Sequence, residues 1–170
     1  MVNQMNNRTA ISLPSEREIL ITRVFDAPRE LVFRAHTDPA LIPLWWGPRS
    51  TTTIVDKMDV RPGGEYRFVH RTEDGSEYVF RGEFREITPP ERLVQTSEIE
   101  GTPGSVLETI TFEEQDGKTT LTILDVCSTK EERDAVLASG MEGGLNESYD
   151  RLAELLAEQE IIRPERQAGL

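Results

Sequence analysis

Hydrophobic and polar residues alternate with a period of two over most of the middle of the chain. The first such segment is EILITRVF, residues 18–25, which is rich in β-branched and aromatic side chains. About six further segments follow between residues 51 and 127, separated by turn sequences such as RPGG at 61–64 and DG at 116–117. Short turns join neighbouring antiparallel strands. The pattern therefore predicts one curved antiparallel sheet of about six to seven strands.

The segment after the first strand has helical spacing instead. Pro28 suits the first turn of a helix, and apolar residues recur at helical intervals up to His36. Asp38 and Pro39 are typical of a second helix start. Pro43 lacks a backbone donor and should interrupt that helix after about one turn. We therefore expect two short helices after the first strand.

A second helical region follows the last strand. Ser128 or Thr129, with Glu131 or Glu132 three residues later, has the spacing of a capping box and predicts a short helix at about residues 129–139. A longer amphipathic helix is expected at about residues 141–160. Its apolar stripe recurs every three or four positions at Met141, Leu145, Tyr149, Leu152 and Leu156.

These elements predict a single α+β domain. Residues 1–15 and 161–170 are expected to be flexible tails, and residues 16–160 to form the domain, of a size that can bury a core. A sheet must cover one face with another layer, so the long C-terminal helix should lie across it. A curved sheet that grips one helix does not fill its interior easily. We therefore expect a hydrophobic cavity between the sheet and this helix.

The residues that would line such a cavity come from the aromatic strand face, the helix stripe and the tryptophan pair. The same side chains would equally suit a filled core, and their pattern does not separate the two interpretations. His70 is expected to be a satisfied interior or rim histidine rather than a general base. The candidate ligand-binding residues are Trp45, Trp46, Tyr66, Phe68, His70, Tyr78, Phe80, Met141, Leu145 and Tyr149.

The two tryptophans of the chain, Trp45 and Trp46, are adjacent and lie between Pro43 and Pro48. Neighbouring side chains on a helix diverge by about 100°, so the two rings cannot share one environment. One ring can pack into the core while the other faces a pocket mouth or the edge of the sheet. Alternatively, both rings fill the gap between a short helix and the sheet.

Composition narrows the function classes. A net charge of −12 argues against a nucleic-acid partner and against adsorption to anionic membranes. A single cysteine, Cys127, cannot form an intramolecular disulfide or a cysteine zinc site, and no cofactor or metal is predicted. No membrane-spanning segment or secretory signal is recognised, so a cytoplasmic location is expected. The protein is expected to be a monomer or a homodimer.

Acid–base chemistry has one candidate. Asp125 falls on the same strand face as Leu121 and Ile123, where an inward carboxyl would have a raised pKa. No neighbouring base is identifiable, and no nucleophile–base pair or phosphate-binding loop occurs. The sequence therefore predicts no catalytic residue and favours a protein that is not an enzyme.

Three segments carry a resemblance to a known family: FDAPRELVFRAHTDPALIPLWWGP, DVRPGGEYRF and LNESYDRLAELL. Over about residues 18–158 the chain resembles single-domain proteins related to the activator of heat-shock protein 90 ATPase, within the SRPBCC or START-like superfamily. This resemblance implies a helix-grip fold. Two residues depart from the family pattern: Pro43, where members usually continue a helix, and His36, where an aromatic residue is more usual.

The resemblance is less specific for function, because the fold carries lipid carriers, hormone binders, polyketide cyclases and co-chaperone modules. We expect a binding protein for a hydrophobic or aromatic small molecule. The alternatives are a chaperone-stimulating or stress-response interaction module, and a polyketide cyclase-like enzyme that uses polar groups of the cavity.

Overall fold

A computed structural model describes residues 9–158 and contains one antiparallel sheet of eight strands. The strand order is β1-β2-β8-β7-β6-β5-β4-β3, so all neighbours except β2 and β8 are consecutive in the chain. The strands are β1 (Ala10–Ser12), β2 (Glu18–Phe25), β3 (Thr52–Met58), β4 (Glu65–Arg71), β5 (Glu77–Thr88), β6 (Arg92–Ile99), β7 (Val106–Gln115) and β8 (Lys118–Val126).

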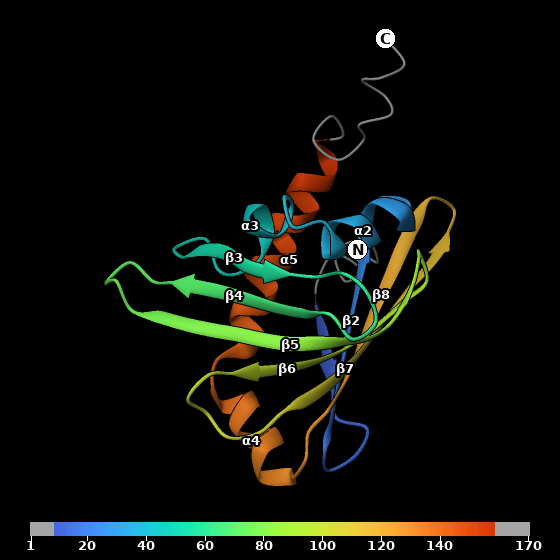
Figure 1. Ribbon diagram of the computed structural model, residues 1–170. Helices are drawn as coiled ribbons and strands as arrows, with labels where there is room; N and C mark the ends of the chain where they lie inside the picture. Colours follow the sequence, from blue (N-terminus) through green and yellow to red (C-terminus); the bar gives the residue numbers. More distant parts are fainter. Residues whose placement is uncertain (1–8, 159–170) are drawn as a thin grey trace.

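Helices cover one face of this curved sheet (Figure 1). The long helix α5 crosses that face, with α2 and α3 beside its C-terminal half and α4 at its N-terminal end (Figure 1). This arrangement confirms the predicted α+β fold, in which an antiparallel sheet grips a C-terminal helix. The helices are α2 (Arg29–Thr37), α3 (Ile42–Trp45), α4 (Lys130–Ala138) and α5 (Met141–Ala157).

The N-terminal edge of the sheet differs from the prediction. Residues 10–12, expected within a flexible tail, form β1 and pair with β2 in the register Ala10↔Thr22 and Ser12↔Leu20. A strand of three residues is too short for its periodicity to be recognised, which explains why the sheet has eight strands rather than six or seven. The tail predicted at residues 161–170 lies outside the described residues.

The second short helix also begins later than expected. The backbone amides of Leu41 and Ile42 bond to the Asp38 carbonyl in a turn, and α3 then starts at Ile42 with Pro43 in its first turn. The prediction that Pro43 interrupts a helix begun at Asp38 is therefore wrong. The first amides of a helix have no partner within it, so proline is tolerated there. The expectation of two short helices is confirmed.

The two C-terminal helices start as the sequence indicates. Thr129 and Glu132 form a reciprocal capping box at the start of α4. Gly140 separates α4 from α5 with a φ of +84°, a left-handed conformation that glycine adopts without a steric penalty. The core lies between α5 and the sheet. Its largest completely buried side chains include Phe25, Phe84, Phe112, Leu93, Leu121 and Leu152.

Candidate functional site

Trp45 ends α3 inside the core. Its side chain is 3% exposed, and its Nε1–H donates to the Ala35 carbonyl oxygen at 3.0 Å. The ring is stacked on Tyr149 of α5 with centroids 5.8 Å apart and planes 21° apart. Its apolar surface and its one polar atom are therefore both satisfied by protein.

A group of rings closes around Trp45, which we call the inner cluster. His36 of α2 packs against Trp45 at 4.9 Å and against Phe112 at 5.3 Å between centroids. Every member is buried, and the cluster joins α2, α3 and α5 to the sheet. His36 Nδ1 lies 2.8 Å from the Val32 carbonyl oxygen, while its buried Nε2 has no hydrogen-bond partner among residues 9–158. The members of the inner cluster are Phe25, Phe33, His36, Trp45, Phe112 and Tyr149.

Trp46 turns the other way, toward β4 and β5. Its ring meets Phe68, His70 and Phe80 in edge-to-face contacts, at centroid distances of 5.4, 5.7 and 4.9 Å. We call these four residues the outer cluster. Trp46 and Phe80 are only half-buried, whereas Phe68 is buried. The two rings therefore lie in different surroundings, as one of the two alternatives expected: Trp45 packs into the core, while Trp46 lies against β4 and β5, next to the edge strand β3.

His70 is the polar member of the outer cluster. It is 9% exposed, yet neither ring nitrogen has a hydrogen-bond partner among residues 9–158. The expectation of a satisfied histidine is therefore wrong, although the interior position is right. Burial lowers the pKa of His70 and favours the neutral imidazole. A neutral imidazole offers one donor and one acceptor, and both are unused here.

Glycine makes room for this imidazole. Gly47 follows Trp46 with a φ of +100°, and a Cβ atom there would lie 3.2 Å from His70 Nε2 and 3.2 Å from Thr53 Oγ1. Thr53 also donates to the Trp46 carbonyl oxygen at 2.6 Å. The turn after α3 is thus pressed closely against the outer cluster, and a larger residue at position 47 would disturb it.

Tyr66 continues the aromatic face from the outer cluster toward the middle of the sheet. Its ring lies 5.0 Å from Phe68 between centroids, and its hydroxyl donates to the Thr96 carbonyl oxygen at 2.6 Å. Gly82 lies opposite, and a Cβ atom there would come within 2.7 Å of the Tyr66 ring. The tyrosine therefore lies flat on the strand beside it. Burial raises the pKa of Tyr66.

The remaining predicted residues divide between the helix and a strand tip. Met141 and Leu145 of α5 are half-buried and pack against the core. Tyr78 is 53% exposed, although it faces His70 in the β4–β5 register. It lies on the hairpin that projects past the helices (Figure 1). The structure thus brings Tyr66 together with the outer cluster, puts Trp45 and Tyr149 in the inner cluster, and leaves the Tyr78 side chain outside both.

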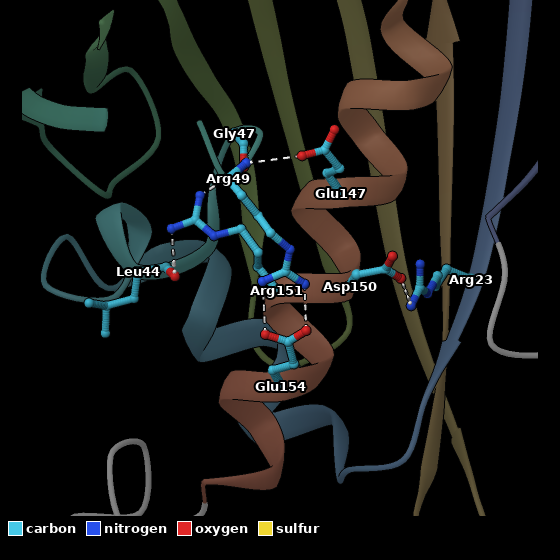
Figure 2. A network of polar contacts seen from close by, with 8 residues as sticks. All are labelled: Arg23, Leu44, Gly47, Arg49, Glu147, Asp150, Arg151 and Glu154. Carbon is cyan, nitrogen blue, oxygen red and sulfur yellow. Dashed lines mark hydrogen bonds and ion pairs between the residues drawn. The ribbon is translucent and has the colours of Figure 1, made fainter. Parts of the chain in front are cut away.

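Polar contacts fasten the turn after α3 to α5 (Figure 2). The Gly47 amide donates to Ser148 Oγ at 2.8 Å, and Arg151 donates to the Gly47 carbonyl at 2.8 Å and to the Leu44 carbonyl at 3.1 Å. Arg49 forms a further ion pair with Glu154, both exposed to solvent. Sequence reasoning missed this attachment. The one available signal was the small polar residue Ser148 beside the apolar stripe of the helix.

Sequence reasoning also missed a polar row across the inner face of the sheet. Asp125 is 6% exposed and points inward as predicted, and Glu108 lies directly opposite it on β7. Gln95 of β6 donates to Glu108 Oε1 at 3.0 Å. Burial and the neighbouring Glu108 raise the pKa of Asp125. The period-two pattern of β7, which puts Glu108 on the face of Ile110 and Phe112, could have revealed this neighbour.

Residues 9–158 contain no group of three or more metal-binding side chains placed to hold an ion. None of the helices in this part of the chain combines the length and apolar character needed to cross a membrane.

Comparison with known families gives a match over most of this fold. Residues 26–157 match the model of the family Activator of Hsp90 ATPase homolog 1-like protein. No curated protein matches the chain at a significant level.

Solved structures agree with the family match. A protein from Rhodobacter sphaeroides is 29% identical with a TM-score of 0.84, over 89% of this chain and 99% of its own. One from Chromobacterium violaceum is 28% identical with a TM-score of 0.75, over 83% and 97% of the two chains. The AHSA1 protein of Silicibacter pomeroyi is 21% identical with a TM-score of 0.69, over 84% and 99%, which shows the likeness of the fold.

Proposed function

The chain belongs to the family of activator of Hsp90 ATPase homolog 1-like proteins, and on that premise we propose that it binds a small hydrophobic or aromatic molecule between the sheet and α5. The observation that carries the proposal is the outer cluster, where half-buried rings surround an imidazole with no hydrogen-bond partner among residues 9–158. Binding of a ligand requires no catalytic residue in this arrangement.

The rings of the outer cluster supply the apolar part of the proposed site. Trp46 and Phe80 keep part of their surface uncovered, in contrast to the rings around Trp45. Covering apolar surface contributes about 25 cal/mol per Å², and a well-oriented aromatic pair adds about 0.5–1.5 kcal/mol. A planar aromatic ligand would gain both contributions.

His70 supplies the polar part. Leaving a buried donor or acceptor without a partner costs about 1–3 kcal/mol. A ligand hydroxyl or carbonyl beside His70 would recover that cost, and so would select among hydrophobic molecules. On the α5 side, Met141 and Leu145 are half-buried, and the unbranched side chain of Met141 adapts to different shapes.

The first test is native mass spectrometry of gently purified protein, followed by a thermal-shift screen with 2-naphthol, flavone and palmitic acid. We expect a retained small molecule or a stabilising shift with at least one of these compounds. A protein with neither a retained mass nor any shift would overturn the proposal.

Variants then locate the site. Trp46→Ala and His70→Phe should weaken binding of the compound that shifts the wild type. Leu44→Ala removes an apolar side chain that is 46% exposed on α3, outside the outer cluster, and should bind as the wild type does. Equal binding by Trp46→Ala and Leu44→Ala would exclude the outer cluster as the site.

A second candidate function is stimulation of an Hsp90-type chaperone. The name of the family favours it, and so do large apolar side chains exposed outside the clusters, Leu44 at 46% and Tyr78 at 53%. The test is the ATPase rate of a purified Hsp90-type chaperone with excess protein. An unchanged rate would dismiss this function, whereas a rise that Leu44→Ala or Tyr78→Ala abolishes would support it.

A further inference from the structure

The polar row across β6, β7 and β8 has no role in the function proposed above. Gln95, Glu108 and Asp125 occupy consecutive positions of the sheet register, with Gln95 opposite Glu108 and Glu108 opposite Asp125. Phe84 and Ile19 continue the row on its two sides, and both are almost completely buried. Two carboxyl groups therefore lie side by side between apolar residues on the face covered by α5.

These carboxyl groups have more acceptor atoms than the protein fills. Gln95 donates one N–H to Glu108 Oε1. Asp125 Oδ1 has no hydrogen-bond partner among the described residues, although Asp125 is only 6% exposed. A buried acceptor without a donor destabilises the folded state. Asp125 Oδ1 is thus a buried acceptor for which residues 9–158 supply no donor.

Two cations on neighbouring elements have partners outside the row, although the buried Nε of Arg23 has no hydrogen-bond partner among residues 9–158. Arg23 of β2 donates to Asp150 at 2.8 Å and to Thr9. Arg133 of α4 donates to the Ser15 carbonyl and to Asp134.

Besides burial, the charges of Glu108 and Asp125 also raise the pKa values of two buried tyrosines, Tyr66 and Tyr149. A neutral tyrosine brings no positive charge to the acids. The Tyr66 hydroxyl donates to the Thr96 carbonyl oxygen. Burial and the nearby acids raise the pKa of Tyr149 of α5, so its hydroxyl is harder to ionise. Because burial and the neighbouring Glu108 raise its pKa, Asp125 favours the neutral form.

We propose that Asp125 and Glu108 anchor the protonated amine of an otherwise apolar ligand. This inference rests on the proposed function, in which a ligand lies between the sheet and α5. An ammonium group is opposite in charge to a carboxylate and brings several donors to the unfilled Asp125 oxygen. Charge-assisted hydrogen bonds are about twice as strong as neutral ones, so an amine is favoured over a hydroxyl. A ligand carboxylate would be repelled.

One continuous face links this anchor to the outer cluster. Besides burial, the charges of Glu108 and Asp125 raise the pKa of Tyr66. The Tyr66 ring contacts Phe68, and Phe68 in turn contacts Trp46. An amine held by the carboxyl pair therefore directs the apolar body of the ligand along Tyr66 toward Phe68 and Trp46.

Three matched probes test the anchor: 2-(aminomethyl)naphthalene, 2-(hydroxymethyl)naphthalene and 2-naphthoic acid, titrated calorimetrically into the full chain at pH 7. The amine should bind about tenfold tighter than the alcohol, a difference of about 1.4 kcal/mol, and the acid should bind most weakly. Asp125→Asn and Glu108→Gln should each remove the preference for the amine and leave alcohol binding nearly unchanged. Glu113→Gln changes an exposed residue of β7, the strand that carries Glu108, and should keep the preference for the amine.

The outcomes separate the two proposals. If the alcohol binds the wild type as tightly as the amine, or if Glu108→Gln retains the preference, the anchor is wrong while the binding function stands. If none of the three probes binds the wild type, the anchor fails, and the binding function is decided by the mass spectrometry and thermal-shift screen described above. Should Asp125→Asn not fold, Glu108→Gln alone decides, because Glu108 is only half-buried.

Discussion

The inner and outer clusters meet at one peptide bond, yet they differ in how completely protein fills them. Each contains one of the two tryptophans and one of the two histidines of the chain. In the inner cluster Trp45 has its hydrogen bond and a stacked partner, whereas in the outer cluster Trp46 keeps exposed surface. The comparison teaches that residue type does not decide whether a ring is fully buried or keeps exposed surface. The turn of the backbone does.

The backbone accounts for the difference directly. Trp45 is the last residue of α3, and Trp46 leaves the helix in an extended conformation with φ −73° and ψ 122°. The change of conformation between them sends one ring toward α2 and α5 and the other toward β4 and β5. A helix that continued through both residues would separate the two side chains by about 100°.

Truncating each tryptophan in turn should give the largest effect. Trp45→Ala should lower the free energy of unfolding by about 3–5 kcal/mol, because it opens a cavity among fully buried rings. Trp46→Ala should cost clearly less, since part of that ring is already in water. Urea denaturation measures both, and equal losses would show that the two clusters do not differ as described.

The inner histidine should make stability depend on pH. Burial lowers the pKa of His36 to about 4, against an ordinary value of 6.5. The unfolded chain therefore takes up a proton on this residue below pH 6.5, while the folded chain does so only near pH 4. The contribution of neutral His36 is complete above pH 6.5 and is lost between about pH 6.5 and 4, a loss of about 3 kcal/mol.

His36→Phe removes this loss, so the variant should lose less stability than the wild type between pH 7 and pH 4.5. Asp125 is present in both proteins and cancels from the difference. His70→Phe is the matched control variant, because it makes the same replacement at the histidine of the outer cluster. Parallel pH profiles for His36→Phe and the wild type in chemical denaturation would contradict the burial of His36 as a neutral group.

The attachment of the α3 turn to α5 should give a smaller effect. Arg151→Met removes the donors to the Gly47 and Leu44 carbonyls and should cost about 1–2 kcal/mol in the free energy of unfolding.

Arg49→Gln breaks only the exposed pair with Glu154 and should produce the smallest change, one that fades with added salt. Thermal denaturation at low and high salt compares the two variants. If Arg49→Gln were the more damaging change, solvent-exposed charge rather than bonds to the turn would hold α3 in place.

The sequence predicts most of this fold because its signals are local and repeated. The strand periodicity, the turn dipeptides and the Thr129–Glu132 capping box each depend on a few neighbouring residues. Strand β1 escaped because three residues carry no readable period, and α3 was misplaced because proline can begin a helix as well as end one.

The candidate site was harder to predict because it depends on register. Glu108 and Asp125 are 17 positions apart in the chain, and only the pairing of β7 with β8 makes them neighbours. The unpaired state of His70 likewise depends on what lies around its ring, which no spacing of residues reveals. Trp45 and Trp46 could be assigned to different surroundings from helix geometry alone, but not to α5 or to β4 in particular.

The division of the two tryptophans has an optical consequence. All indole fluorescence of the chain comes from this one dipeptide, with one ring sealed in an apolar interior and the other partly in contact with water. The emission of the protein is therefore a sum of a blue component from Trp45 and a redder one from Trp46. Replacing Trp45 with phenylalanine leaves Trp46 as an intrinsic fluorophore in the outer cluster. Replacing Trp46 leaves Trp45, whose emission reports unfolding of the core.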